Sequence, residues 1–408
     1  MAHTTHRRRN ALFLLFFVVG VSMASWITRS PAIRDALSVT LAQMGMVLFG
    51  LSVGSMSGIL VAGWAVRAHG TRRVAQWGMG CIAAGLFTIA LGVGLSSPWT
   101  AACGLAGIGA GMGLSEIAIN IDGAHIESRL GKPVLHALHG CFSLGATCGA
   151  LLGMWLTAEA VPVRWHLAAV AVLSLPAMAW GVRQIPDGYG RAAAEADRAG
   201  QAGPAAATDR PKDCAPLAVW RDPRLLLIGF IVLATAFAEG SASDWLPLLM
   251  VDEHGLGQTA GSFTFVVFAG AMTAGRFAGG YFLARFGRVA VLRASALLGA
   301  AGVATVILAD TQAMAGLAVI LWGWGAALGF PVALSAAGDS GPDPAARVRV
   351  AATAGYVAFL VGPPLLGFIG EAVGLRNAMW VVLLLLSGAG CAAGAAASPR
   401  TAQAARAA

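Results

Sequence analysis

A series of long apolar runs, separated by short segments with charges or turn residues, constrains this chain more than any other feature. A membrane-spanning helix needs about 20 mostly apolar residues, whereas a strand of a membrane β-barrel needs about 10 that alternate. The runs here are long and do not alternate, so we predict that they are helices. Charged residues make up only 11% of the chain, whereas a soluble protein has roughly 25%. The composition indicates a membrane protein and argues against a soluble enzyme, a disordered chain or a nucleic-acid-binding module.

We count twelve spans in two groups of six. The first group lies near 11–29, 41–66, 74–96, 99–124, 134–157 and 164–183. The second lies near 224–250, 260–284, 289–309, 312–336, 346–371 and 375–397. Between the groups the sequence is rich in Ala, Gly, Pro and charges, which is typical of a linker. We predict an N-terminal bundle over 1–183, a cytoplasmic linker over 184–222, and a C-terminal bundle with a short cytoplasmic tail over 223–408.

The positions of the basic residues predict the orientation of the spans. Lys and Arg concentrate in short cytoplasmic loops, and placing the N-terminus inside puts most of the 27 Lys and Arg residues on that side. We therefore expect both termini in the cytoplasm. The net charge of +8 then reflects this topology and contact with anionic lipid. The high Ala and Gly content and the absence of targeting signals indicate a bacterial inner membrane.

The two groups of spans also repeat each other. Three glycines recur in the same order 217 residues later, in the pairs Gly58 and Gly275, Gly63 and Gly280, and Gly70 and Gly287. Ordered matches indicate a duplicated six-helix unit, and paired six-helix repeats form one class of secondary transporters. The start of the chain also has the pattern of a signal peptide cleaved after Ala24. We favour a first span there, because the repeat needs a partner for the seventh span.

Two loops resemble a motif of the major facilitator superfamily, in which a Gly precedes an Asp-Arg pair, a second Gly and two Arg. The loop after the second span carries Gly63, Arg67, Gly70, Arg72 and Arg73. The loop after the eighth span carries Gly280, Arg285, Gly287 and Arg288. Both copies lack the Asp, which Arg67 and Ala284 replace. The resemblance implies the major facilitator fold, with two pseudo-symmetric bundles of six transmembrane helices, and assigns these loops to a conformational motif.

Four further segments resemble the MosC-like branch of that superfamily, a bacterial group near the fucose permeases. They are residues 24–33, 116–120, 139–145 and 239–245. The resemblance implies a proton-coupled carrier of a sugar or a related polar solute. Glu116 matches the position of an acidic residue that is linked to proton transfer in the fucose-permease type. The Asp in the first helix of that type has no counterpart here, which argues against transferring fucose specificity.

Four acidic residues lie inside predicted spans, namely Glu116, Asp122, Glu239 and Asp244. Burial in a helix bundle penalises a charged carboxylate and favours proton uptake, so such residues are functional candidates. We predict Glu116, Glu239, Asp244 and His139 as proton-coupling residues. Hydrogen bonding between helices is the alternative for Glu116, and packing is the alternative for His139. For Asp122 we expect a cap or loop contact, and for Arg276 of the eighth span a contact to a loop or to helix ends.

Polar and aromatic residues of the spans are the candidates for solute binding. Ser22, Trp26 and Arg29 share one face of the first helix, and Asn120 shares a face with Glu116. An aromatic ring can stack on a sugar while polar groups bind its hydroxyls. Packing is the alternative for Trp26 and Trp245, and snorkelling is the alternative for Arg29. A pair of Arg29 with Asp244 is a candidate outer gate. The predicted substrate-binding residues are Ser22, Trp26, Arg29, Asn120, Trp245, Trp322 and Tyr356.

The sequence contains no nucleotide-binding loop, metal-ligand cluster or nucleophile triad, and its six Cys lack CxxC spacing. We expect no cofactor, no metal and no enzyme activity. The expected partners are a small-molecule substrate, protons and the lipid bilayer, with no nucleic acid and with a monomer as the working unit.

The predicted function is proton-coupled secondary active transport of a small polar organic solute by alternating access. The two bundles would rock about a cavity lined by the first, fourth, fifth, seventh, tenth and eleventh spans. A proton-driven exporter of drugs or metabolites is the alternative within the same class. A non-transporting sensor and a membrane-embedded enzyme are the alternatives of other classes. The sequence does not select the solute or the direction of transport.

Overall fold

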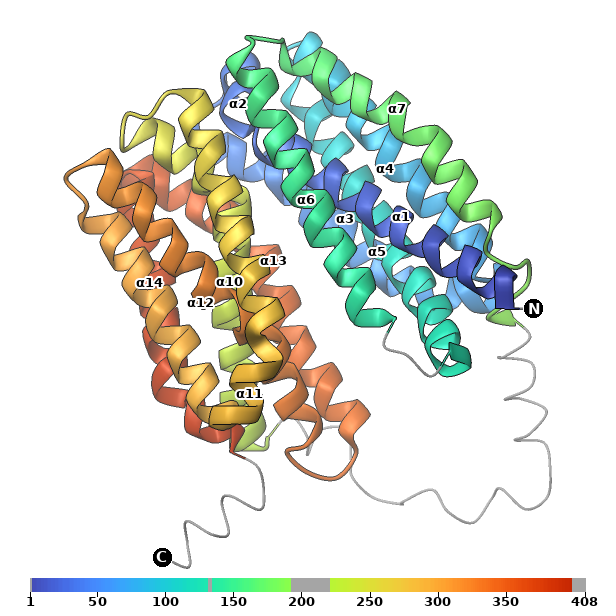
Figure 1. Ribbon diagram of the computed structural model, residues 1–408. Coiled ribbons are helices and arrows are strands. Elements are labelled where there is room, and N and C mark those ends of the chain that lie inside the picture. Colours follow the sequence, from blue (N-terminus) through green and yellow to red (C-terminus); the bar gives the residue numbers. More distant parts are fainter. Residues whose placement is uncertain (1, 131–133, 192–220, 398–408) are drawn as a thin grey trace, which may run out of the picture. The chain divides into compact units, whose positions relative to one another are not determined.

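The computed structural model describes residues 2–130, 134–191 and 221–397, and the elements in these ranges are helices (Figure 1). Eleven of them are long and apolar enough to cross a membrane. One of the eleven, α11, contains two of the predicted spans, so the described residues hold all twelve. The predicted all-α membrane fold is confirmed.

The chain forms two compact units, Met1–Pro211 and Lys212–Ala408. The described helices of the first unit are α1 (Ala2–Ile27), α2 (Ser30–Leu37), α3 (Leu41–His69), α4 (Thr71–Gly94), α5 (Pro98–Leu130), α6 (Leu135–Ala158) and α7 (Val163–Arg183). Those of the second unit are α10 (Pro223–Asp252), α11 (Gln258–Leu308), α12 (Gln312–Gly338), α13 (Pro344–Val373), α14 (Leu375–Ala392) and the 3-10 helix η1 (Ala393–Ala396). Most of the predicted linker and most of the predicted tail, residues 192–220 and 398–408, lie outside the described residues.

Each unit turns at one of the repeated glycines. Gly287 interrupts the helical geometry of α11 with φ 74° and ψ 168°. Its partner in the repeat, Gly70 between α3 and α4, has φ 84° and ψ 162°. Glycine adopts a positive φ at little cost because it has no Cβ. The two units therefore turn at equivalent glycines with nearly the same backbone conformation, as expected of a duplicated six-helix unit.

Other glycines let the helices of the first unit approach closely. α5 packs on both α3 and α4, and α1 packs on α6. A methyl group added at Gly54 of α3 would collide with the backbone carbonyl of Ala106 in α5, and one at Gly109 of α5 would collide with that of Leu51. Close backbone contact is a main source of helix association in a bilayer, where apolar side chains gain little by leaving lipid.

The first span takes part in this packing, and a helix that we did not expect follows it. Gly145 of α6 lies against the backbone carbonyl of Phe17 in α1. α1 ends at Ile27, and the short helix α2 begins at Ser30. Pro31 cannot continue α1, because it has no N–H group and its ring would clash with the carbonyl of Ile27. A proline in the first turn of a helix avoids both problems, which explains the new start.

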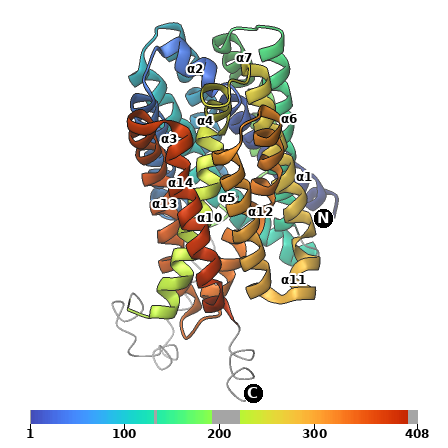
Figure 2. The same ribbon diagram turned by 90° about the vertical axis from the view of Figure 1, so that its left-hand side faces the viewer.

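The second unit is built around α10, which contacts α11, α12, α13 and α14 (Figure 2). Asp222 caps this helix, because its side chain accepts hydrogen bonds from the backbone N–H groups of Arg224 and Leu225. Asp222 also accepts a hydrogen bond from Arg347 of α13. Burial opposes ionisation of Asp222, but the Arg347 guanidinium and the two backbone N–H groups outweigh it and lower the pKa of Asp222. The start of α10 is therefore tied to the start of α13.

The described beginning of the predicted linker is held on the first unit. The backbone N–H of Thr71, at the start of α4, donates to the carbonyl of Tyr189 at 2.8 Å. The Tyr189 ring lies 4.6 Å from the ring of His125 in α5, and the guanidinium of Arg8 lies 5.2 Å from the Tyr189 ring. Residues 184–191 therefore pack at one end of the first unit.

Candidate functional site

Glu116 and Asn120 lie one helical turn apart on α5, near its middle. Glu116 is exposed, and among the described residues its carboxylate has no hydrogen bond or ion pair. Asn120 is half-buried, and its Oδ1 atom is buried without a donor. A carboxylate within a membrane-spanning helix is energetically costly, so it is by default a candidate for a functional role. The pair offers a group that can take up a proton beside an amide that can accept and donate hydrogen bonds.

Asp122, six residues beyond Glu116, has a different environment. Its side chain is 0% exposed and accepts two hydrogen bonds from Arg8 of α1, one of them 2.6 Å long from Nε. We expected a cap or loop contact for Asp122, and that expectation was wrong. The contact with Arg8 joins two helices, because the turn of α5 that carries Asp122 faces the start of α1.

Glu239 of α10 pairs with Arg276 of α11. The Nη2 atom of Arg276 donates to Oε1 of Glu239 at 2.9 Å, and both side chains are partly exposed. We expected Arg276 to contact a loop or helix ends, and this was also wrong. The sequence contains a signal that could have linked the two residues, since both are charges within apolar spans that follow each other in the chain and their charges are opposite.

Asp244 and Trp245 lie farther along α10. Asp244 is buried, and within the described part of the chain it has no hydrogen bond or ion pair. Trp245 is completely buried, and its Nε1 atom has no acceptor. Trp322 of α12 is also completely buried, but its Nε1–H donates to the carbonyl of Ala238 in α10 at 3.2 Å. Trp322 thereby connects two helices of the second unit.

The three candidates of the first helix differ in their local structure. The Ser22 hydroxyl donates to the carbonyl of Val18 one turn earlier, at 2.8 Å. Trp26 is buried in the last turn of α1, and its Nε1 atom has no acceptor. Arg29 lies beyond α1, in the break before α2, and its Nη2 atom donates to the carbonyl of Val161 at 2.5 Å. Arg29 is buried, so the snorkelling interpretation is wrong for this conformation.

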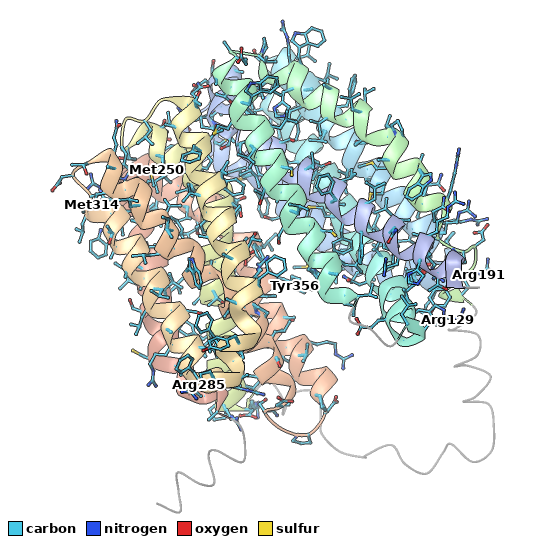
Figure 3. The ribbon with its side chains drawn as sticks, viewed as in Figure 1. Arg129, Arg191, Met250, Arg285, Met314 and Tyr356 are labelled. Carbon is cyan, nitrogen blue, oxygen red and sulfur yellow. The ribbon has the colours of Figure 1, made fainter. Side chains whose placement is uncertain are left out.

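The other two candidates lie on α6 and α13. The His139 ring is exposed and meets the ring of Phe16 in α1 edge-on, with 5.4 Å between the ring centres. Tyr356 is half-buried. It lies near the middle of the second unit, whereas Arg285 lies at one end and Met250 at the opposite end (Figure 3).

The two loops of the conformational motif surround the glycines with positive φ. The Nη1 atom of Arg72, two residues after Gly70, lies 3.6 Å from Oδ2 of Asp187. Arg288, next to Gly287, donates to Asp339 at 2.7 Å. Each copy of the motif therefore forms an ion pair. Its Arg follows the glycine by one or two residues, and its Asp comes from another segment of the same unit.

The structure thus sorts the predicted residues by unit. Glu116, Asn120 and the first-helix candidates belong to the first unit, whereas Glu239, Asp244 and the remaining Trp and Tyr candidates belong to the second. A pair of Arg29 with Asp244 would join the units and stays a prediction. No group of three or more His, Cys, Asp or Glu side chains able to hold a metal ion occurs in the described ranges.

Comparison with known proteins gives consistent matches over nearly the whole chain. The model of the Major Facilitator Superfamily matches residues 11–352. An uncharacterized MFS-type transporter of Yersinia pestis is 29% identical over 382 residues, which are 91% of each chain. The membrane protein MosC of Rhizobium meliloti is 27% identical over 383 residues, or 91% of this chain and 86% of MosC. The resemblance to the superfamily and to MosC is confirmed.

Solved structures agree on the fold. The nucleoside transporter NupG superimposes with a TM-score of 0.67 at 16% identity, covering 95% of this chain and 98% of NupG. FucP, the fucose:proton symporter of E. coli, superimposes with a TM-score of 0.59 at 17% identity, covering 96% of this chain and 98% of FucP. At such low identity these matches show a shared fold alone.

Proposed function

Since this chain belongs to the Major Facilitator Superfamily, we propose that it is a proton-coupled secondary active transporter of a small polar organic solute. It works by alternating access in a bacterial inner membrane, with both termini in the cytoplasm. The names of its structural neighbours support this class of solute, because FucP is described as a fucose:proton symporter and NupG as a nucleoside transporter.

The observation that carries the proposal is the division of the four acids into two kinds. Asp122 and Glu239 each have an Arg partner, and a cationic neighbour favours the charged form of a carboxylate. Glu116 and Asp244 have no such partner among the described residues. A proton is then the simplest means of removing their charge inside a membrane. Glu116 and Asp244 are therefore our first candidates for proton coupling, and Glu239 is secondary.

Glu116 is the stronger candidate for proton coupling because of its neighbour Asn120. Asn120 presents an unpaired amide oxygen one turn away, so a bound solute can contact the amide while a proton occupies the carboxylate. Loading both groups leaves no net charge on this face of α5. A neutral site changes its exposure from one side of the membrane to the other more easily than a charged one, because an unpaired charge in the membrane is costly.

The test measures proton movement in proteoliposomes that enclose a pH-sensitive dye. A panel of neutral sugars, polyols and inositols, together with sugar acids, is added to the wild type and to Glu116→Gln. Proton movement with one solute is expected in the wild type and is expected to be lost in the variant. Exchange of radiolabelled solute between the two sides should survive in the variant, because exchange needs no net proton transfer.

Glu159→Gln is the matched control, since it removes an exposed carboxylate at the end of α6, beyond the span. It should behave as the wild type does. An unchanged pH dependence of uptake in Glu116→Gln would contradict the role of Glu116. Net uptake of a solute by the wild type without proton movement would contradict proton coupling itself.

A further inference from the structure

A group of buried polar atoms at one end of the first unit has no role in the proposal above. Eleven buried side-chain nitrogen or oxygen atoms of the described residues have no hydrogen-bond partner. Six of the eleven belong to only four residues, Trp26, Arg29, Ser30 and His166, which we call the α1–α2 cluster. Three of the four lie within five residues of sequence, with Trp26 in the last turn of α1, Arg29 in the break and Ser30 at the start of α2.

Three segments of the first unit meet around Arg29 and His166 of the cluster. Arg29 is bonded through Nη2 to the carbonyl of Val161, in the loop before α7, and His166 lies in the first turn of α7. Gly153 of α6 lies against the side chain of Thr28, and a Cβ on this glycine would be 3.5 Å from Cε1 of His166. Arg29 is 4% exposed and His166 is 2% exposed. The cluster is therefore closed to solvent in this conformation.

The energetics of the cluster argue against a purely structural role. Burying a polar group without a partner is unfavourable, and burying a charge is more so unless the charge is paired. Arg29 has no carboxylate partner within the described residues, and the acid in α2, Asp35, pairs with Arg34. Buried polar groups in native proteins are almost always hydrogen-bonded, so this concentration of unpaired groups calls for an explanation, and a bound ligand is one that would complete them.

The unpaired atoms define the chemistry of that ligand. Trp26 Nε1, Arg29 Nε and Arg29 Nη1 are donors only, the Ser30 hydroxyl can donate, and a neutral His166 supplies one donor and one acceptor. The cluster thus has an excess of donors and one permanent positive charge. A carboxylate offers acceptors only and one negative charge, and it forms strong charge-assisted hydrogen bonds with a guanidinium. A phosphate dianion would leave one negative charge uncompensated in a buried site.

We propose that the α1–α2 cluster binds the carboxylate of an organic acid, so that the transported solute is a hydroxylated monocarboxylate instead of a neutral sugar. Arg29 balances the charge, and Trp26 and Ser30 donate to the carboxylate oxygens. The acceptor nitrogen of His166 receives a hydroxyl of the solute. This inference rests on the proposed function, since it names the solute class of the same transporter. Because the cluster is closed, the acid enters only when the α1–α2 break or the loop before α7 moves.

The test measures binding to the purified full-length protein, without transport. Acetate, inorganic phosphate, glucuronate and glucose are titrated at constant ionic strength, and stabilisation against thermal unfolding gives the affinity of each. We expect glucuronate to bind at least tenfold more tightly than glucose, and acetate to bind more tightly than phosphate. Arg29→Gln should weaken glucuronate binding at least tenfold, and Arg29→Lys should weaken it less because it keeps the charge.

Arg164→Gln is the matched control, since it removes an exposed positive charge two residues before His166. It should leave the affinity for glucuronate unchanged. If Arg29→Gln does not fold, His166→Gln provides a second comparison. It should weaken the binding of glucuronate more than the binding of acetate, because only glucuronate has hydroxyls for His166 to bind. Equal affinities for glucuronate and glucose, or no saturable binding of either acid to the folded protein, would overturn the proposal.

The two proposals fail in different ways. Proton movement driven by a neutral solute, with no binding of acids, would refute the carboxylate site and keep proton coupling. Binding of acids that depends on Arg29, with no proton movement during their net uptake, would keep the site and refute the coupling.

Discussion

Replacing Arg8 by Gln is expected to lower the free energy of unfolding by about 3–5 kcal/mol, because it leaves a buried charge without its partner. The carboxylate of Asp122 is 0% exposed, whereas the side chain of Arg8 is 12% exposed at the start of α1. Asp122→Asn should therefore cost less, about 1–3 kcal/mol, since the remaining Arg8 can reach water. The double variant should be more stable than the sum of the single effects predicts, with a coupling of about 1–3 kcal/mol.

The assay follows unfolding of the purified protein in mixed micelles, by far-UV circular dichroism, for the wild type, both single variants and the double variant. Arg34→Gln serves as the control, because Arg34 and Asp35 form an ion pair on the surface, where an ion pair contributes about 0–1 kcal/mol. The reasoning is refuted if Arg8→Gln destabilises the protein no more than Arg34→Gln does. It is also refuted if the effects of the two single variants simply add.

Two further predictions concern packing and pH. Gly54→Val should destabilise the first unit by about 1–3 kcal/mol in the same unfolding assay, because its Cβ would collide with the backbone of α5. Gly80→Ala is the control and should be neutral or stabilising, since a Cβ there would meet nothing within 4 Å. Asp222 has a lowered pKa because Arg347 and backbone N–H groups outweigh burial. It therefore stabilises the fold above its unfolded pKa of about 3.9 and loses this effect as the pH falls through its lower folded pKa. The stability difference between wild type and Asp222→Asn should be full at pH 6 and shrink below about pH 4; a difference that does not depend on pH would contradict this.

Much of the fold could be predicted from sequence because the signals are local. A span needs only a long apolar run, and the twelve predicted runs correspond to helices of the structure. The repeat in the sequence already paired Gly70 with Gly287. Both adopt a positive φ at a turn between helices, a conformation that residues with a Cβ avoid. The break at Pro31 was also readable, since proline cannot continue a helix. Our predicted first span ended at residue 29, two residues beyond the end of α1, and we did not predict the short helix α2 that follows.

The candidate site was less predictable, because a residue in a span can have several partners. The sequence identified Asp122, Glu239 and Arg276 as charges in apolar surroundings, but not that Arg8 would neutralise the first or that the other two would pair. His166 carried no signal at all, because it is an ordinary position near the start of a span. Only its burial without partners beside Arg29 marks it as a candidate.

By itself, the sequence determined that this protein lies in a membrane, that it consists of helices, that it repeats a six-helix unit and that it belongs to its superfamily. The first two properties depend on hydropathy and on the length of apolar runs, and the last two depend on glycines and motif residues whose order along the chain can be compared directly. The tertiary structure alone decided which acids are neutralised by an Arg and which polar atoms are buried without a partner. Those properties depend on which helix faces meet, and residues more than a hundred positions apart, such as Arg8 and Asp122 or Arg29 and Val161, come together only in the packed unit.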